Sequence, residues 1–302
     1  MPEFSIFCGK LSLLGRMAKW KRCGLQNRHA GVRFPLRPQM IKKTALMVIV
    51  LSTLYLVLST TVRAQEFDFN KAFQDYQFSL TAYDQAYASF SDARDFYLKN
   101  QTLTLKEDAR KKTLTMLKVR DQLYVVYLTT LRMKIVEIKG LTNDEKGAMF
   151  TKLDGEVAWY KSHSENYKDG DALEDLFNKS SESESRYKTD TLPIVYEALF
   201  TISLGEEVGL RQDHEAIYAD LKSGITNPDP FSRWFNDIEN VDKVLKANED
   251  TARTQLQKMY SQNYSPASSY NTAIATLTSS LKPLSQFNQF LIEVTTAIQN
   301  QK

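Results

Sequence analysis

Cysteine is scarce in this sequence, and its larger part has none. Cys8 and Cys23 are the only two cysteines among the 302 residues. A region without cysteine can form no disulfide, offers no thiolate nucleophile and supplies no cysteine ligand for zinc. Residues 65–302 must therefore be stabilised by a hydrophobic core, and 238 residues are enough to form a large one.

Sequence motifs typical of catalysis are also lacking. There is no Gly-rich phosphate loop, no Gly-x-Ser-x-Gly and no His-Glu-x-x-His, and residues 65–302 hold only two histidines, His163 and His214. Carboxylates are plentiful, but charged residues on helices are normally just solvated. We therefore predict no catalytic residues, no cofactor and no enzymatic activity.

The one long hydrophobic run of the sequence spans residues 44–58. It follows a short basic segment that begins at Met40, and small residues occupy the −3 and −1 positions, Val62 and Ala64. A basic start, an apolar centre and small residues before a polar Gln65 form the pattern of an export signal. We predict a signal peptide at residues 40–64 and an exported, extracytoplasmic protein, either secreted or periplasmic.

Retention of the segment as an N-terminal membrane anchor is the alternative. A membrane-spanning helix needs about 20 apolar residues, and residues 44–59 approach that length. The small residues Val62 and Ala64 favour cleavage. We expect contact with a membrane only if the signal is retained, and then only through residues 44–59.

Residues 1–39 carry eight bases and one acid, and we interpret them as a non-native upstream extension. The sequence from Gly31 to Pro35 can be back-translated as GGG-GTT-CGA-TTC-CCC, which resembles the T-arm of a transfer RNA gene. The sequence from Gly24 to Arg28 can be written as an anticodon stem-loop of tRNA-Cys. Met40 is then the true start. An ordinary basic extension is the alternative, and the nucleotide sequence decides between the two.

Removing residues 1–64 reverses the sign of the net charge. That segment holds 11 Lys or Arg and one acid, so residues 65–302 contain 28 bases and 35 acids, a net charge of −7. Nucleic-acid binding without sequence preference depends on Lys and Arg facing phosphates. We therefore expect no nucleic-acid partner.

Apolar residues follow helical spacing in almost all of residues 65–302. The clearest set recurs at alternating steps of four and three residues, with Arg94 the one miss, namely Phe69, Phe73, Tyr76, Leu80, Tyr83, Tyr87, Phe90 and Tyr97. Such a seam is typical of a helix that packs along a partner helix. A carbohydrate or hydrophobic-ligand surface is the alternative, but the heptad spacing favours core packing.

Three later segments complete the helical pattern. Residues 103–139 have apolar residues on two faces, which predicts the most central helix. Thr142 and Glu145 have the spacing of a capping box and predict the start of the next helix. Residues 178–190 are polar almost all round and form either a solvated helix or a loop.

Prolines mark the joints of the second half. Pro193 suits the first turn of a helix, the strongest break lies at residues 223–230, and Pro283 should kink or split the last helix. No segment alternates long enough to build a sheet. We predict an all-α fold, an antiparallel bundle of long helices after the N-terminal signal or anchor segment. The break at 223–230 either divides this bundle or lies within a continuous one.

Two short stretches offer the only candidate metal ligands. Glu156 precedes His163 by seven residues, and Glu207 precedes His214 by seven. Residues seven apart share a helix face but lie about 10.5 Å apart along the axis, too far for one metal ion to bind both. The four residues could form a site only if their two helices were antiparallel neighbours. A histidine on a helical seam is more often a hydrogen-bonded core or boundary residue.

These features favour a protein that acts by binding. We predict an exported, non-enzymatic helical bundle that serves as an envelope-associated interaction or scaffold module. Its partner would be another protein or a second copy, bound through the helix faces. The alternative is an extracytoplasmic receptor that holds a small ligand or metal between helices.

Overall fold

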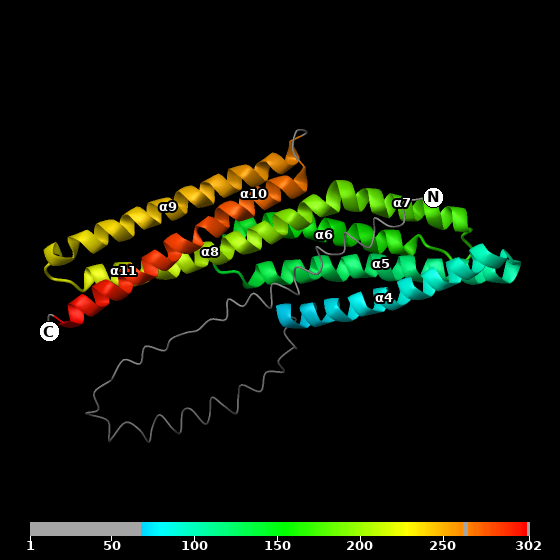
Figure 1. Ribbon diagram of the computed structural model, residues 1–302, viewed down its shortest axis with the longest axis horizontal. Helices are drawn as coiled ribbons and strands as arrows, with labels where there is room; N and C mark the ends of the chain where they lie inside the picture. The colour runs from blue at the N-terminus through cyan, green and yellow to red at the C-terminus, as the bar shows by residue number, and fades with distance from the viewer. Residues whose placement is uncertain (1–67, 262–264, 301–302) are drawn as a thin grey trace, which may run out of the picture. The chain divides into compact units, whose positions relative to one another are not determined.

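The apolar spacing is realised as helices throughout the described part of the chain (Figure 1). The computed structural model describes residues 68–261 and 265–300, and these residues contain no strand. The helices are α4 (Phe69–Asn100), α5 (Leu103–Glu137), α6 (Asn143–Glu165), α7 (Leu173–Arg186), α8 (Leu192–Ser223), α9 (Ser232–Gln257), α10 (Pro266–Ser279) and α11 (Leu281–Asn300). The predicted all-α fold is confirmed for these residues, whereas the predictions for residues 1–39 and 40–64 lie outside them.

Helix α4 begins and ends with side-chain and backbone caps. The Asp68 carboxylate accepts a hydrogen bond from the Lys71 N–H, and the Gln101 N–H donates to the Tyr97 carbonyl at the other end. The aromatic seam is buried or half-buried along its whole length. It packs mainly against α5, as the heptad spacing predicted.

Helix α5 is the central helix of the first half. It contacts α4, α6, α7 and α8, and its buried residues lie on more than one face, as expected from its two apolar stripes. Leu128, Leu131 and Ile135 are completely buried. The next helix starts at the predicted capping box, where the Glu145 N–H donates to the Thr142 hydroxyl and the Thr142 N–H donates to the Glu145 carboxylate.

The polar segment at residues 178–190 is helical. Helix α7 runs into a π-helical turn at Tyr187–Thr191, and α8 follows without a break. Pro193 lies in the first turn of α8, as predicted. Because proline has no N–H to donate and its ring crowds the carbonyl four residues earlier, a regular α-helix is unfavourable there. The wider π turn, in which the Leu192 N–H donates to the Tyr187 carbonyl, accommodates it.

Helix α8 belongs to both halves of the unit formed by Gln65–Lys302. It contacts α5 and α6 in the first half and α9, α10 and α11 in the second (Figure 1). One core cluster joins α8 to α9 and α10 and consists of Phe200, Leu204, Val208, Ala252, Leu256, Ala273 and Leu277. A second joins α9 to α11 and consists of Ile238, Leu245, Leu284, Phe287 and Leu291.

Both predicted joints of the second half are present. Helix α8 ends at Ser223, and α9 begins at Ser232 after a short 3₁₀ turn. The last helical segment is split at Ser280, three residues before Pro283. None of the described helices is both long enough and apolar enough to cross a membrane.

Candidate functional site

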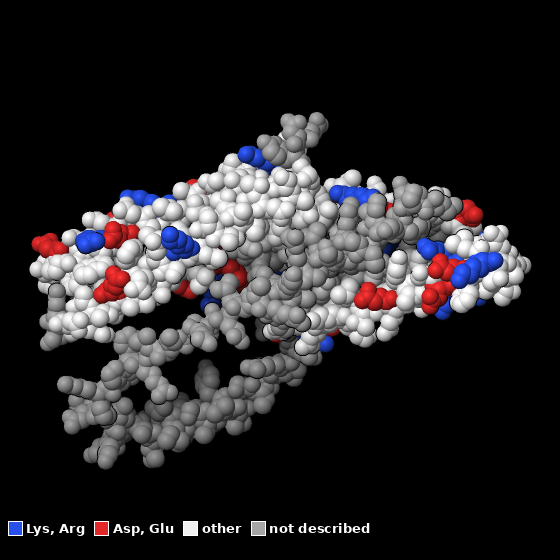
Figure 2. Space-filling model, in the orientation of Figure 1, with Lys and Arg blue, Asp and Glu red and all other residues white. Residues whose placement is uncertain are grey.

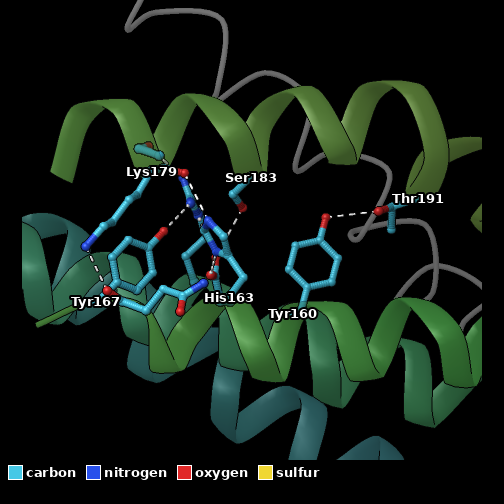
Figure 3. A network of polar contacts seen from close by, with 10 residues as sticks. Tyr160, His163, Tyr167, Lys179, Ser183 and Thr191 are labelled. Atoms are coloured by element: carbon cyan, nitrogen blue, oxygen red, sulfur yellow. Dashed lines mark hydrogen bonds and ion pairs between the residues drawn. The ribbon is translucent and has the colours of Figure 1, made fainter. Parts of the chain in front are cut away.

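A buried polar network joins α5, α6 and α7, and we name it the His163 network (Figure 3). It consists of Arg120 and Asp121 of α5, His163 of α6, Tyr167 just after α6, and Lys179, Ser180 and Ser183 of α7. Asp121 is fully buried, and Arg120 and His163 are nearly so. Buried charges are costly unless they are paired and hydrogen-bonded, so these contacts decide whether the network stabilises the fold.

Both ring nitrogens of His163 face acceptors. Nδ1 lies 2.5 Å from Oδ2 of Asp121, and Nε2 lies 3.1 Å from the backbone carbonyl oxygen of Lys179. A carbonyl oxygen only accepts, so Nε2 carries a proton. Nδ1 and the Asp121 carboxylate share a second hydrogen bond. His163 of α6 is therefore linked to α5 through Nδ1 and to α7 through Nε2.

Asp121 is the common acceptor of the network. Besides His163, it accepts from Arg120 Nε at 3.3 Å and from the Ser183 hydroxyl at 3.2 Å. The Arg120 guanidinium also donates to the Tyr167 hydroxyl at 3.1 Å and to the Ser180 hydroxyl at 2.9 Å. Burial raises the pKa of Tyr167, which keeps its hydroxyl protonated. The contacts hold three helices together through mutually satisfied groups.

The network contains Ser, His and Asp, but not in the order of a nucleophilic triad. In such a triad, the imidazole accepts the proton of the serine hydroxyl. Here Ser183 donates to Asp121, and the two His163 nitrogens face Asp121 and Lys179. Trp159 stacks on the imidazole ring, with ring centroids 4.7 Å apart. This geometry positions the imidazole as a helix-to-helix bridge.

A second polar cluster lies at the π turn. Arg186 forms two hydrogen bonds to Glu156, at 2.5 and 3.3 Å, and the Thr191 hydroxyl donates to the same carboxylate at 2.6 Å. Because the proton of Thr191 is used there, the Tyr160 hydroxyl is the donor in its 3.0 Å contact with Thr191. The π turn thus directs Thr191 towards α6 (Figure 3).

A third cluster, in the second half, contains an unsatisfied acid. Glu207 of α8 is buried, and neither carboxylate oxygen has a hydrogen-bond partner. Burial, with the charge of Glu249 added to it, raises the pKa of Glu207 to about 7, although the nearby Ser280 hydroxyl and Arg211 lower it. Arg211 itself pairs with Glu249, with Nε 2.7 Å from Oε1. The carboxyl group of Glu207 therefore titrates near neutral pH.

His214 has a different environment. Its ring lies 5.3 Å from the ring of Phe287, centroid to centroid, and its buried Nδ1 has no hydrogen-bond partner. Burial lowers its pKa, against the raising effect of Asp213. The neutral imidazole is therefore favoured.

The four candidate metal ligands occupy separate environments. Glu156 contacts Arg186, His163 contacts Asp121, Glu207 lies near Ser280, and His214 lies against Phe287. Within residues 68–261 and 265–300, no group of three or more His, Cys, Asp or Glu side chains is arranged to hold a metal ion. A metal site formed by these four residues remains a prediction without geometric support in this part of the chain.

Sequence reasoning identified His163 and Glu156 but not their partners. Asp121 lies on one apolar face of α5, four residues after Leu117 and three before Tyr124, and Arg120 directly precedes it. A charged pair inside such a helix is itself a signal of a buried polar contact. Arg186 and Thr191 had no comparable signal, because Arg186 lies within residues 178–190, which are polar almost all round, and Thr191 directly follows them.

No protein-family model, no curated protein and no solved structure matches this sequence. The function of the protein must therefore be inferred from its own residues and their geometry.

Proposed function

We propose that the protein is an exported, non-enzymatic helical bundle that acts as an envelope-associated interaction or scaffold module. The main support is helix α4, which is 32 residues long and has α5 as its main neighbour. Its seam faces α5, and the other side of the helix is exposed and bears Phe78, whose exposure is 77%. A long helix with one uncovered face offers an extended contact surface for another helix.

The buried polar clusters support the same proposal. The His163 network joins α7 to α5 and α6, and the Glu156–Arg186 contact joins α6 to the last residue of α7. Fully satisfied polar networks rigidify the helices that they join. A rigid framework presents its surface in one conformation and lowers the entropic cost of binding.

Site-specific photo-crosslinking tests the proposal. A photoreactive residue at Phe78 should give a discrete covalent adduct in intact cells, either with a second copy or with one envelope protein. The same residue at Gln212, an exposed position on α8, is the matched control and should give none. Absence of any adduct at Phe78, together with a monomer at cellular concentration, would contradict the proposal.

A second candidate is an extracytoplasmic receptor for a small ligand or metal. It is favoured by Glu207 and His214, which have buried polar atoms without a hydrogen-bond partner. Native mass spectrometry of the purified protein would show a bound species, and Glu207→Gln or His214→Ala would abolish its binding. A spectrum with only the polypeptide mass after growth in rich medium would argue against the receptor.

A further inference from the structure

The turn between α4 and α5 combines exposed apolar side chains with lysines. Phe96 is 58% exposed, Leu98 57% and Leu103 84%, all within eight residues. Lys99 and Lys106 are exposed in the same stretch, and residues 96–106 contain no Asp or Glu. Large apolar side chains gathered at one exposed place mark an interaction site more often than scattered ones do.

The turn is held in one conformation. Gln101 adopts a left-handed conformation with φ 40°, and its N–H donates to the Tyr97 carbonyl at 2.8 Å. On the other side, the Thr102 hydroxyl accepts from the Leu105 N–H at 3.3 Å and caps α5. Figure 1 shows the turn at the far end of the hairpin, beyond the start of α7. The exposed apolar side chains therefore lie at a hairpin end whose backbone is capped on both sides.

The charge at this end is opposite to that of the rest of the unit. Residues 92–112 contain six bases and four acids, whereas the remainder of residues 65–302 contains 22 bases and 31 acids. Two of the four acids are neutralised by ion pairs, Asp95 with Arg94 at 2.9 Å and Glu107 with Arg110 at 2.7 Å. The other two acids, Asp92 and Asp108, stay exposed and oppose the lysines in part. Figure 2 shows basic, acidic and uncharged surface next to one another at this end.

We propose that the α4–α5 turn inserts into the interface of an anionic lipid membrane. Phe96, Leu98 and Leu103 enter the boundary between headgroups and acyl chains, while Lys99 and Lys106 meet lipid phosphates. Local positive charge on an otherwise acidic unit selects an anionic surface. A few apolar side chains and two lysines give weak, reversible binding.

This contact departs from the expectation that only residues 44–59 meet a membrane, and it is separate from the exposed face of α4 around Phe78. It goes beyond the proposed function, since the turn can bind lipid whether or not the helix faces bind a protein. Residues 65–302 form one compact unit with all three described apolar clusters inside it. This unit is the species to test, after circular dichroism has verified that each variant is helical.

Co-sedimentation with vesicles tests the inference. We expect the unit to bind vesicles of phosphatidylcholine with phosphatidylglycerol, to bind pure phosphatidylcholine vesicles much more weakly, and to be released by high salt. Leu103→Glu should lower the partition coefficient at least tenfold. Ile292→Glu, at an exposed apolar position on α11 away from the turn, is the control and should leave it within twofold.

The lysines provide an independent arm of the experiment. Each lysine near an anionic surface contributes about fivefold to binding, so Lys99→Gln with Lys106→Gln should lower the partition coefficient about 25-fold. Lys243→Gln with Lys282→Gln removes the same charge from exposed positions elsewhere and should have little effect. Failure to bind anionic vesicles would overturn the inference, as would loss of binding by Ile292→Glu alone. Dissociation of a dimer by Leu103→Glu without lipid would assign the turn to a second copy instead.

Discussion

At the scale of single residues, the stability of the first half depends on a few charged groups in an otherwise apolar core. Asp121 has no exposed surface and accepts hydrogen bonds from Arg120, His163 and Ser183. It is the group that neutralises the cationic Arg120 and holds the imidazole of His163 in place. Removing one partner from a buried ionic group leaves the others uncompensated, which is far more costly than removing the whole group.

We therefore expect Asp121→Asn to lower the free energy of unfolding by about 3–5 kcal/mol. The change preserves the shape of the side chain but leaves Arg120 without its buried counter-charge. Urea denaturation of the 65–302 unit measures the effect. The matched control is Asp154→Asn, which breaks the largely exposed pair with Arg132 and should cost less than about 1 kcal/mol. Equal effects of the two substitutions would show that the network contributes no special stability.

Glu207 makes stability depend on pH. Its pKa is raised to about 7 in the folded protein, mainly by burial, and returns to its ordinary lower value on unfolding. A raised folded-state pKa means that the stabilisation is fully present below the unfolded pKa, near 4.5, and is lost as pH rises to about 7. We expect this group to remove up to about 3 kcal/mol of stability across that range.

Glu207→Gln should abolish this part of the pH dependence. Chemical denaturation at several pH values between about 4.5 and 8 gives the free energy of unfolding of the variant and of the native chain, and the difference between their pH dependences is the contribution of Glu207. Glu206→Gln, which alters the neighbouring and partly exposed acid that pairs with Lys134, is the control. A pH slope that is the same in Glu207→Gln and the native chain would be incompatible with a raised pKa at this position.

At the scale of helices, local rules were enough for most of the boundaries. The capping box at Thr142, the break at 223–230 and the split near Pro283 each follow from backbone chemistry within a few residues, and each is present. The π turn at Tyr187–Thr191 could not be predicted in the same way. It depends on Pro193 and on the contact of Thr191 with Glu156, which is distant in sequence.

The candidate site was harder to predict than the helices. His163 and Glu156 were identifiable as polar residues on a seam, but their partners Asp121 and Arg186 come from helices whose relative placement no local pattern fixes. The environment of Glu207 could not be predicted either. Its carboxylate lacks a hydrogen-bond partner because of the way α8 packs near Ser280, at the joint between α10 and α11. Local sequence determines whether a helix forms, whereas the pairing of buried polar side chains depends on the tertiary packing of the helices.

A glycine contact fixes where the connection between α5 and α6 meets α8. A Cβ atom on Gly140 would lie 2.2 Å from the Gly205 carbonyl oxygen and 2.3 Å from the Gly209 nitrogen. Both neighbours are backbone atoms that cannot move aside without shifting a helix. Gly140→Ala should therefore destabilise the protein by about 1–3 kcal/mol, measured by denaturation.

The control for this substitution is Gly147→Ala. Gly147 lies inside α6, and an added Cβ would meet no atom within 4 Å. Replacing a glycine in a helix interior with alanine normally raises stability by about 0.5–1 kcal/mol. Opposite signs for the two substitutions are expected. A stabilising Gly140→Ala would show that α8 does not approach the connection this closely.

At the scale of the whole described unit, α8 joins the helices before it in the chain to those after it. It contacts helices of both halves, and the ion pair of Glu145 in α6 with Arg253 in α9, at 2.9 Å, adds a direct link between them. Contacts of this kind across the break at 223–230 favour cooperative unfolding.

Two tryptophans report on the two halves separately. Trp159 lies in α6 and Trp234 in α9, and they are the only tryptophans of residues 65–302. The variants Trp159→Phe and Trp234→Phe each leave one tryptophan in residues 65–302. In each variant, we expect the thermal unfolding curve measured by tryptophan fluorescence to coincide with the curve measured by helical circular dichroism. Transitions that separate by several degrees between fluorescence and circular dichroism would show that the halves unfold independently.

The proposed function depends above all on export, because export determines which partners and lipids the unit can meet. Intact-mass spectrometry of the protein recovered from fractionated native cells tests this most directly. We predict a chain in the extracytoplasmic fraction whose mass corresponds to a start at Gln65, after the signal at residues 40–64. A cytoplasmic protein that retains residues 40–64 would contradict the proposed export and the function built on it.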